Sequence, residues 1–251
     1  MIEAIIFDLD GTLVQTEPLR ALSHARTALA LSTDSFSEAD VFEACREWVG
    51  LSHVETVLGL MERFGLQEAA RARMSEFGAS APWQVFAALD RRFYAEMISD
   101  PGTVCQAQMP HAVALLHDVR ERGFRTGLAT MSARAEVDRV LAALGLGQAF
   151  EFIATCEDVE DAKPDPEIFQ LVARRLAVAP AACLVIEDSS AGVRAALAAG
   201  MECIAVPSGF ARDPVDLARL LDPRWVVRDA NTLGAVAQQK LKGRKSSSNR
   251  S

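Results

Sequence analysis

The chain has 251 residues and a formal net charge of −8; half of its residues are apolar and 6 % are aromatic. This length suits one large domain or two modest ones, and the acidic balance excludes broad binding to nucleic acid. No apolar run reaches the roughly 18 residues of a membrane span, and Glu3 follows the start too closely for a signal peptide. Five cysteines without CxxC spacing indicate reduced thiols, so we expect a cytoplasmic protein with no membrane partner.

The predicted elements begin with a short strand over residues 3–8, which is apolar on both faces like a buried parallel strand. From residue 19 to about 98, the hydrophobic spacing is helical only. A capping box over Ser35–Glu38 is expected to start a helix there. The amphipathic segments cover residues 21–31, 39–49, 53–66 and 83–98.

After Pro101, strands and helices alternate along the chain. Strands are predicted over residues 124–130, 150–155, 182–188, 202–207 and 224–229. Helices are predicted over residues 111–123, 134–145, 165–176 and 190–200. This alternation is typical of a doubly wound, Rossmann-like parallel sheet of the α/β class.

The order of elements predicts three parts. Residues 1–14 and 99–239 should form the α/β core, and residues 15–98 an all-helical insertion. The insertion leaves the core next to the first strand, so it should lie over the carboxyl ends of the strands, where such sheets bind ligands. Residues 240–251 are basic, rich in serine and free of acids, as in a disordered tail.

Two carboxylates end the first strand in the stretch "IIFDLDGTLV", residues 5–14. Asp8 and Asp10 point to the same side because side chains alternate along a strand. Two like charges this close repel each other unless a cation or a shared proton relieves them. The stretch therefore predicts a metal, a proton, or both; a simple strand-ending Asx turn is the alternative.

Three further polar clusters follow predicted strands or precede a helix. They are Thr130-Met131-Ser132, Lys163-Pro164-Asp165-Pro166 and Glu187-Asp188-Ser189. Carboxylates with few histidines suit a hard cation such as Mg²⁺. A lysine, hydroxyl groups and turn N–H groups suit a phosphate. Asp165 is expected to cap a helix rather than to bind a ligand.

The order of these motifs resembles that of the haloacid dehalogenase-like hydrolases, from residue 1 to about residue 210. The likeness is strongest in "FDLDGTLV", "AKPDPEIF" and "LVIEDSSAGVRAALAAGM". The last stretch is similar to the branch that holds β-phosphoglucomutase and small sugar-phosphate phosphatases. The resemblance implies the Rossmann-like core and identifies the helical insertion as a cap domain.

The resemblance also implies roles for particular residues. Asp8 would be the nucleophile that forms an aspartyl-phosphate, and Asp10 the general acid and then base. Lys163 would neutralise the phosphate and the nucleophile together. Thr130, and with it the Ser132 hydroxyl, would grip a phosphoryl oxygen, with Gly11 and Met131 beside them. Mg²⁺ would be held by Asp8, the backbone carbonyl of Asp10, Asp188 and Glu187.

Substrate contacts from the helical insertion are less defined. Ser52 or His53, in "WVGLSHVETVL", would read the substrate as in the sugar-phosphate branch. Arg20 stands where the mutases have a histidine, and Gln15 where relatives often have aspartate. The other helical histidines, including His24, are expected at surfaces or grooves.

These inferences favour a Mg²⁺-dependent phosphatase whose partner is its substrate, a small phosphorylated metabolite. The protein itself is expected to be a monomer or a weak homodimer. A phosphomutase working through the same aspartyl-phosphate is the alternative. A dehalogenase needs no second aspartate, yet Asp10 is present. A catalytically silent binding protein on this fold remains a further alternative, because fold does not imply function.

Overall fold

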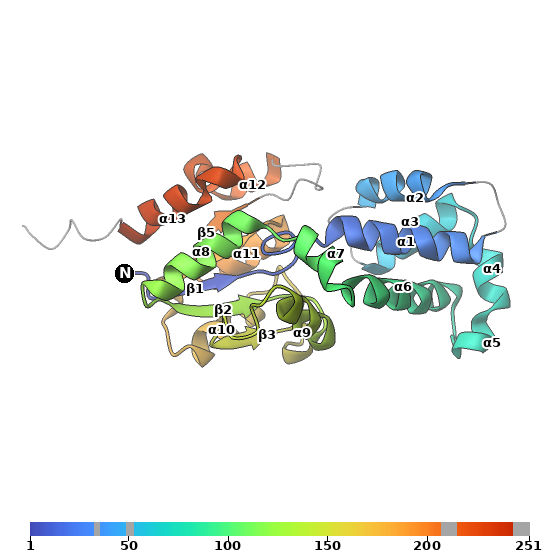
Figure 1. Ribbon diagram of the computed structural model, residues 1–251, viewed down its shortest axis with the longest axis horizontal. Coiled ribbons are helices and arrows are strands. Elements are labelled where there is room, and N and C mark those ends of the chain that lie inside the picture. Colours follow the sequence, from blue (N-terminus) through green and yellow to red (C-terminus); the bar gives the residue numbers. More distant parts are fainter. Residues whose placement is uncertain (33–35, 49–52, 207–214, 243–251) are drawn as a thin grey trace, which may run out of the picture. The chain divides into compact units, whose positions relative to one another are not determined.

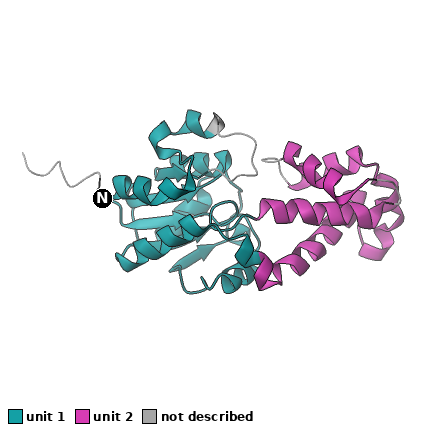
Figure 2. Cartoon of the chain, turned by 45° about the horizontal axis from the view of Figure 1, so that its top comes forward, with its two compact units in different colours: residues 1–15, 104–208, 213–251 teal, residues 16–103, 209–212 magenta. Residues whose placement is uncertain are grey.

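The computed structural model describes residues 1–32, 36–48, 53–206 and 215–242. Within them the chain separates into two compact units, shown in teal and magenta in Figure 2. Residues 1–15 and those from 104 onward form what we call the α/β unit, and residues 16–103 form the helical unit. That the helical unit acts as a cap remains a prediction.

The α/β unit is built on five parallel strands in the order β3-β2-β1-β4-β5 (Figure 1). In chain order these are β1 (Ala4–Phe7), β2 (Arg125–Ala129), β3 (Phe152–Ala154), β4 (Cys183–Glu187) and β5 (Glu202–Ala205). The predicted doubly wound parallel sheet is thus confirmed. The order reverses beside β1, since β2 and β4 flank it on opposite sides, and such a switch point is where open sheets bind ligands.

The predicted strand over residues 224–229 is wrong. Pro223–Trp225 form a 3₁₀ helix, because Pro223 has no N–H for a ladder and the Asp222 side chain accepts from the N–H of Arg224 at 3.1 Å. Val226 makes only an isolated bridge to Ala205. The apolar pattern of this segment reflects burial rather than strand pairing.

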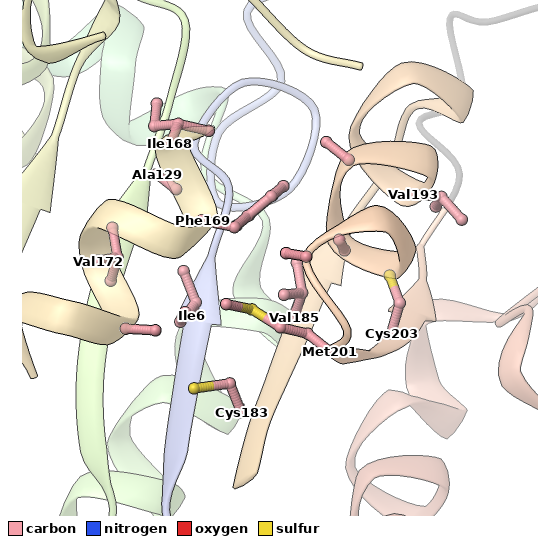
Figure 3. Close-up of a cluster of buried hydrophobic side chains, with 14 of the residues drawn as sticks. Ile6, Ala129, Ile168, Phe169, Val172, Cys183, Val185, Val193, Met201 and Cys203 are labelled. Atoms are coloured by element: carbon pink, nitrogen blue, oxygen red, sulfur yellow. The ribbon is translucent and has the colours of Figure 1, made fainter. Parts of the chain in front are cut away.

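One face of the sheet packs on two helices, α10 (Glu167–Arg175) and α11 (Ser190–Ala198). Figure 3 shows Ile6 and Val185 of the sheet with Phe169 of α10, all three fully buried. Burying such a side chain stabilises the fold by about 1.5–3 kcal/mol. This packing fixes the ends of β1 and β4, which carry Asp8 and Glu187.

The remaining helices complete the two units. In the α/β unit they are α8 (Pro110–Glu121), α9 (Arg134–Ala143), α12 (Val215–Leu220) and α13 (Leu233–Lys242), with α7 (Pro101–Gln106) at the boundary. In the helical unit they are α1 (Glu17–Leu31), α2 (Glu38–Cys45), α3 (His53–Arg63), α4 (Gln67–Ala72), α5 (Met74–Phe77) and α6 (Pro82–Ile98). None of the described helices combines the length and the apolar composition of a membrane span.

The start of α2 corrects the predicted capping box. Ser37, not Ser35, is the N-cap: its hydroxyl accepts from the N–H of Asp40 at 3.2 Å, and the Asp40 carboxylate accepts from the N–H of Ser37 at 2.8 Å. Ser35–Glu38 and Ser37–Asp40 both have the spacing of a capping box, so the sequence alone did not show which serine is the cap. Ser35 itself lies outside the described residues.

Candidate active site at the carboxyl ends of the strands

The end of β1 leads directly into a tight turn. The N–H of Asp8 still donates to the sheet, to Ile186 O at 3.0 Å, and the N–H of Gly11 then donates to Val14 O at 2.7 Å. Gly11 has φ +79°, and a Cβ there would lie 2.0 Å from Asp188 Oδ2. Only glycine meets both requirements, so the turn brings the Asp188 carboxylate against the β1 loop.

The Lys163 ammonium group lies at the centre of the site. It donates to Asp8 Oδ1 at 2.7 Å, to Glu187 Oε1 at 2.7 Å and to the carbonyl of Ala129 at 3.0 Å. Its side chain is only 6 % exposed. Three donors thus meet three acceptors from the ends of β1, β2 and β4, which ties the strands of the switch point together.

Burial and charge act against each other in this cluster. Burial by itself lowers the pKa of Lys163, but the carboxylates of Asp8 and Glu187 outweigh it and hold that pKa above its usual range. Lys163 is therefore charged at neutral pH. Burial raises the pKa of Asp8 well above the usual value; Lys163 opposes this shift, and the neighbouring Glu187 and Asp10 carboxylates add to it.

Glu187 is held by the first turn of α11. Its Oε2 accepts from the N–H of Ser189 at 2.8 Å and from the Ser189 hydroxyl at 2.9 Å, and that hydroxyl also caps Gly192 N at 3.0 Å. A Cβ at Gly192 would lie 1.7 Å from Glu187 Oε1. Ser189 and Gly192 were not predicted as supports of Glu187, although a serine before an apolar helix is an N-cap signal.

Asp10 is oriented by the segment after β2. Its Oδ2 accepts from the hydroxyls of Thr130 and Ser132, at 3.0 Å and 2.6 Å, and the N–H of Ser132 donates to Thr130 Oγ1 at 3.0 Å. Thr130 and Ser132 are both buried. The two hydroxyls predicted to grip a phosphoryl oxygen thus contact the second aspartate here, while Met131 packs against the apolar core.

The neighbouring Lys163 loop leads into α10. Asp165 Oδ1 accepts from the N–H of Glu167, the first residue of α10, at 2.9 Å, although the N-cap position itself is occupied by Pro166. The Lys163 ammonium lies 4.9 Å from the centre of the Phe169 ring, so this side chain of the apolar core borders the site.

The donor set fits a hard divalent cation. One carboxylate oxygen from each of Asp8, Glu187 and Asp188 lies within 4.8 Å of the others. Oxygen ligands of this kind suit Mg²⁺, and a dication would relieve the repulsion among the three carboxylates that Lys163 relieves in part. Asp8, Asp188 and the backbone carbonyl of Asp10 would hold the ion, with Glu187 tied to Lys163 and Ser189 beside it.

We expect Mg²⁺ to raise the melting temperature and Asp188→Asn to remove most of that gain. A ligand at a hundredfold excess over its dissociation constant stabilises by about 2.7 kcal/mol. Thermal melts with and without Mg²⁺ measure the effect, with Asp161→Asn, an exposed acid of the Lys163 loop, as the control. An equal Mg²⁺ response in Asp188→Asn would place the metal elsewhere.

The helical unit holds the other predicted residues. The guanidinium carbon of Arg20 lies 3.6 Å from the centre of the Tyr94 ring. His53 begins α3 and is an exposed residue. The part of its ring that is shielded from solvent lowers its pKa, and the Asp90 carboxylate opposes this shift. Ser52 lies outside the described residues. The placement of His24 at a surface or groove is wrong: His24 is buried, with Nδ1 2.8 Å from Asp90 Oδ1.

Residues 2–200 match the family model of the haloacid dehalogenase-like hydrolases, and the chain belongs to this family. The Phosphorylated carbohydrates phosphatase of Thermotoga maritima is 30 % identical over 80 % of this chain and 83 % of its own length. The chain is therefore a hydrolase of the phosphatase class, as the sequence predicted.

Two solved structures extend the similarity. A β-phosphoglucomutase from Clostridium difficile has a TM-score of 0.69 and 26 % identity, with 96 % of each chain covered. CbbY from Rhodobacter sphaeroides, solved in complex with xylulose-(1,5)bisphosphate, has a TM-score of 0.60 and 26 % identity over 84 % of this chain and 89 % of that chain. These relatives include both phosphatase and phosphomutase names.

Proposed function

We propose that the protein is a Mg²⁺-dependent phosphatase of a small sugar or polyol phosphate, working through an aspartyl-phosphate on Asp8. The observation that carries this proposal is the buried Lys163 ammonium, bonded to Asp8 at 2.7 Å beside a group of three carboxylates. A nucleophilic carboxylate, a fixed positive charge and a cation-binding set in one place suit attack on a phosphate monoester.

In the first step a carboxylate oxygen of Asp8 attacks phosphorus, and the bond from phosphorus to the substrate oxygen breaks. Asp10 gives its proton to that leaving oxygen, so an alcohol departs. In the second step Asp10 takes a proton from water, whose oxygen attacks phosphorus and releases inorganic phosphate and the free Asp8. Mg²⁺, when bound, supplies positive charge that offsets the phosphoryl and carboxylate charges.

The supporting residues act on position and charge. Lys163 holds Asp8 in place and offsets the negative charge that phosphate brings. Thr130 and Ser132 hold Asp10 Oδ2, which keeps the acid at a fixed position at the end of β1. When phosphate enters, the same hydroxyls and the turn at Gly11 are the candidate donors to its oxygens, beside Met131.

The substrate class is proposed from the relatives. One relative is named for phosphorylated carbohydrates, and another was solved with a bisphosphorylated pentulose. We propose that the helical unit is the cap that closes over this substrate, with Ser52, His53 and Arg20 as its contacts. The monomeric or weakly dimeric state and the cytoplasmic location remain predictions.

A phosphomutase is the second candidate, because the matched β-phosphoglucomutase structure covers 96 % of this chain. A mutase must return the phosphoryl group to a sugar hydroxyl and so must hold a second phosphate with a fixed cation. Arg20, whose guanidinium stacks on Tyr94, stands where the mutases have a histidine. Arginine does not exchange a proton near neutral pH as that histidine can, so the coupling of proton transfer to a second phosphoryl acceptor is lost, and we favour water over a sugar as the acceptor.

The test is release of inorganic phosphate from a panel of triose, pentose, hexose and polyol phosphates, with Mg²⁺ and with EDTA. We expect Mg²⁺-dependent release from at least one of them. β-Glucose 1-phosphate with a trace of the 1,6-bisphosphate tests the second candidate. Rapid formation of glucose 6-phosphate with little free phosphate would replace the phosphatase by the mutase.

A further inference from the structure

A second group of metal-binding side chains lies in the helical unit, independent of the carboxylates at the strand ends. It consists of His24 on α1, His53 at the start of α3 and Asp90 on α6. One ligand atom from each lies within 4.8 Å of the others. Three different helices thus contribute one side chain each, and two of these side chains are histidines, which soft and borderline cations prefer.

The buried half of this group is already ordered. Asp90 is 1 % exposed, its Oδ1 accepts from the Ser23 hydroxyl, and it faces His24 Nδ1 at 2.8 Å. A metal ion would take the place of the proton between these two atoms, so that His24 Nδ1 and Asp90 Oδ1 both become ligands. Two ligands of one Zn²⁺ at about 2.0–2.1 Å with tetrahedral angles lie about 3.3 Å apart, so this pair needs to separate by only about half an ångström.

The two imidazole rings have a separation suitable for one ion. Their centres are 5.7 Å apart and their planes are inclined by 41°. If each nitrogen binds Zn²⁺ at about 2.0–2.1 Å with tetrahedral angles, the ring centres lie about 5.2 Å apart. The difference is small, and His53 has an exposed side chain that is able to rotate toward the buried pair.

We propose that His24, His53 and Asp90 bind a borderline transition-metal dication of the Zn²⁺ type in the helical unit, with His53 then holding the ion in place of the substrate contact proposed above. Two imidazoles and one carboxylate are a donor set that Zn²⁺ accepts, and three protein ligands leave a fourth position open. The alternative is that Ser23, His24 and Asp90 form a hydrogen-bonded network that only joins α1 to α6. That alternative requires neither His53 nor an ion.

The test uses the full chain with histidine rings labelled with ¹⁵N and with excess Mg²⁺ to occupy the carboxylate site. Four histidines are present: His24, His53, His111 and His117. Addition of one equivalent of Zn²⁺ should shift the ring signals of His24 and His53 and leave the other two in place. Unshifted signals of His24 and His53, or equal shifts of all four, would overturn the proposal.

A variant pair provides a second, independent readout. His53→Gln should weaken Zn²⁺ binding by at least about tenfold in calorimetry. Because His53 is exposed, its substitution should leave the metal-free melting temperature unchanged, unlike a change at the buried His24. His117→Gln is the matched control and should keep wild-type affinity. Unchanged Zn²⁺ affinity in His53→Gln would contradict the site, whatever substrate the enzyme hydrolyses.

Discussion

Replacing Asp8 by asparagine should abolish phosphate release while the chain stays folded. An amide has the shape of the carboxylate but not its nucleophilic oxygen, so the covalent step is lost. Removing a catalytic nucleophile typically lowers turnover by about 10⁴-fold or more. Turnover of p-nitrophenyl phosphate and a thermal melt measure the two effects, and Asp138→Asn, an exposed acid on α9, is the control. Turnover within about tenfold of wild type would reject Asp8 as the nucleophile.

In the absence of metal, the Asp8→Asn variant should also change the pH dependence of the free energy of unfolding. Burial holds the pKa of Asp8 well above its usual value. The native chain therefore keeps a proton that the unfolded chain has already lost above about pH 4, so this group makes stability fall as pH rises toward the raised pKa. Asp8→Asn should remove that part of the slope in melts recorded with EDTA. An identical slope in both proteins would contradict the assigned shift.

Replacing Lys163 by methionine should have the second large effect, on both activity and stability. Methionine keeps the length of the side chain but leaves Asp8 and Glu187 buried without their shared cation. Breaking a buried ion pair by removing one partner costs about 3–5 kcal/mol. Loss of a fixed charge that stabilises the transition state should lower turnover by about 10²–10³-fold.

Chemical denaturation and steady-state turnover measure these losses, and Lys163→Arg is the control that keeps the charge. The stability loss should shrink at acid pH, because protonation of Asp8, whose pKa is raised by burial, removes the repulsion that the lysine relieves. Saturating Mg²⁺ should recover part of it for the same reason. A methionine variant as stable and as active as wild type would show that Lys163 is an ordinary buried lysine.

Much of the fold could be predicted because strand–helix alternation and strand-end motifs are local signals. Asp8 and Lys163, 155 positions apart, meet because parallel strands end at one edge of the sheet. The last predicted strand failed because Pro223 and the Asp222 cap outweigh the apolar pattern after them. Whether a strand or a 3₁₀ helix forms here depends on this local turn, which the spacing of hydrophobic residues does not indicate.

Other parts of the site depend on tertiary contacts that no spacing reveals. The hydroxyls of Thr130 and Ser132 were expected on a phosphate, yet in the structure they donate to Asp10, which is available only once β1 and β2 pair. His24 was placed at a surface or groove, although it lies between Ala21 and Ala25 on the buried face of α1. The helical spacing of these residues was the one indication that His24 is buried. Nothing in the sequence indicated that its partner would be Asp90, 66 residues away.

The most direct test of the central claim is to isolate the phosphorylated chain. In Asp10→Asn, p-nitrophenyl phosphate should still phosphorylate Asp8, because its leaving group needs little protonation, but water attack should stall without the base. Rapid acid quench should then show a burst of one equivalent of nitrophenolate, and mass spectrometry should place one phosphoryl group on the peptide that contains Asp8. Steady release of phosphate with no phosphorylated chain, or a phosphoryl group on another residue, would contradict the account.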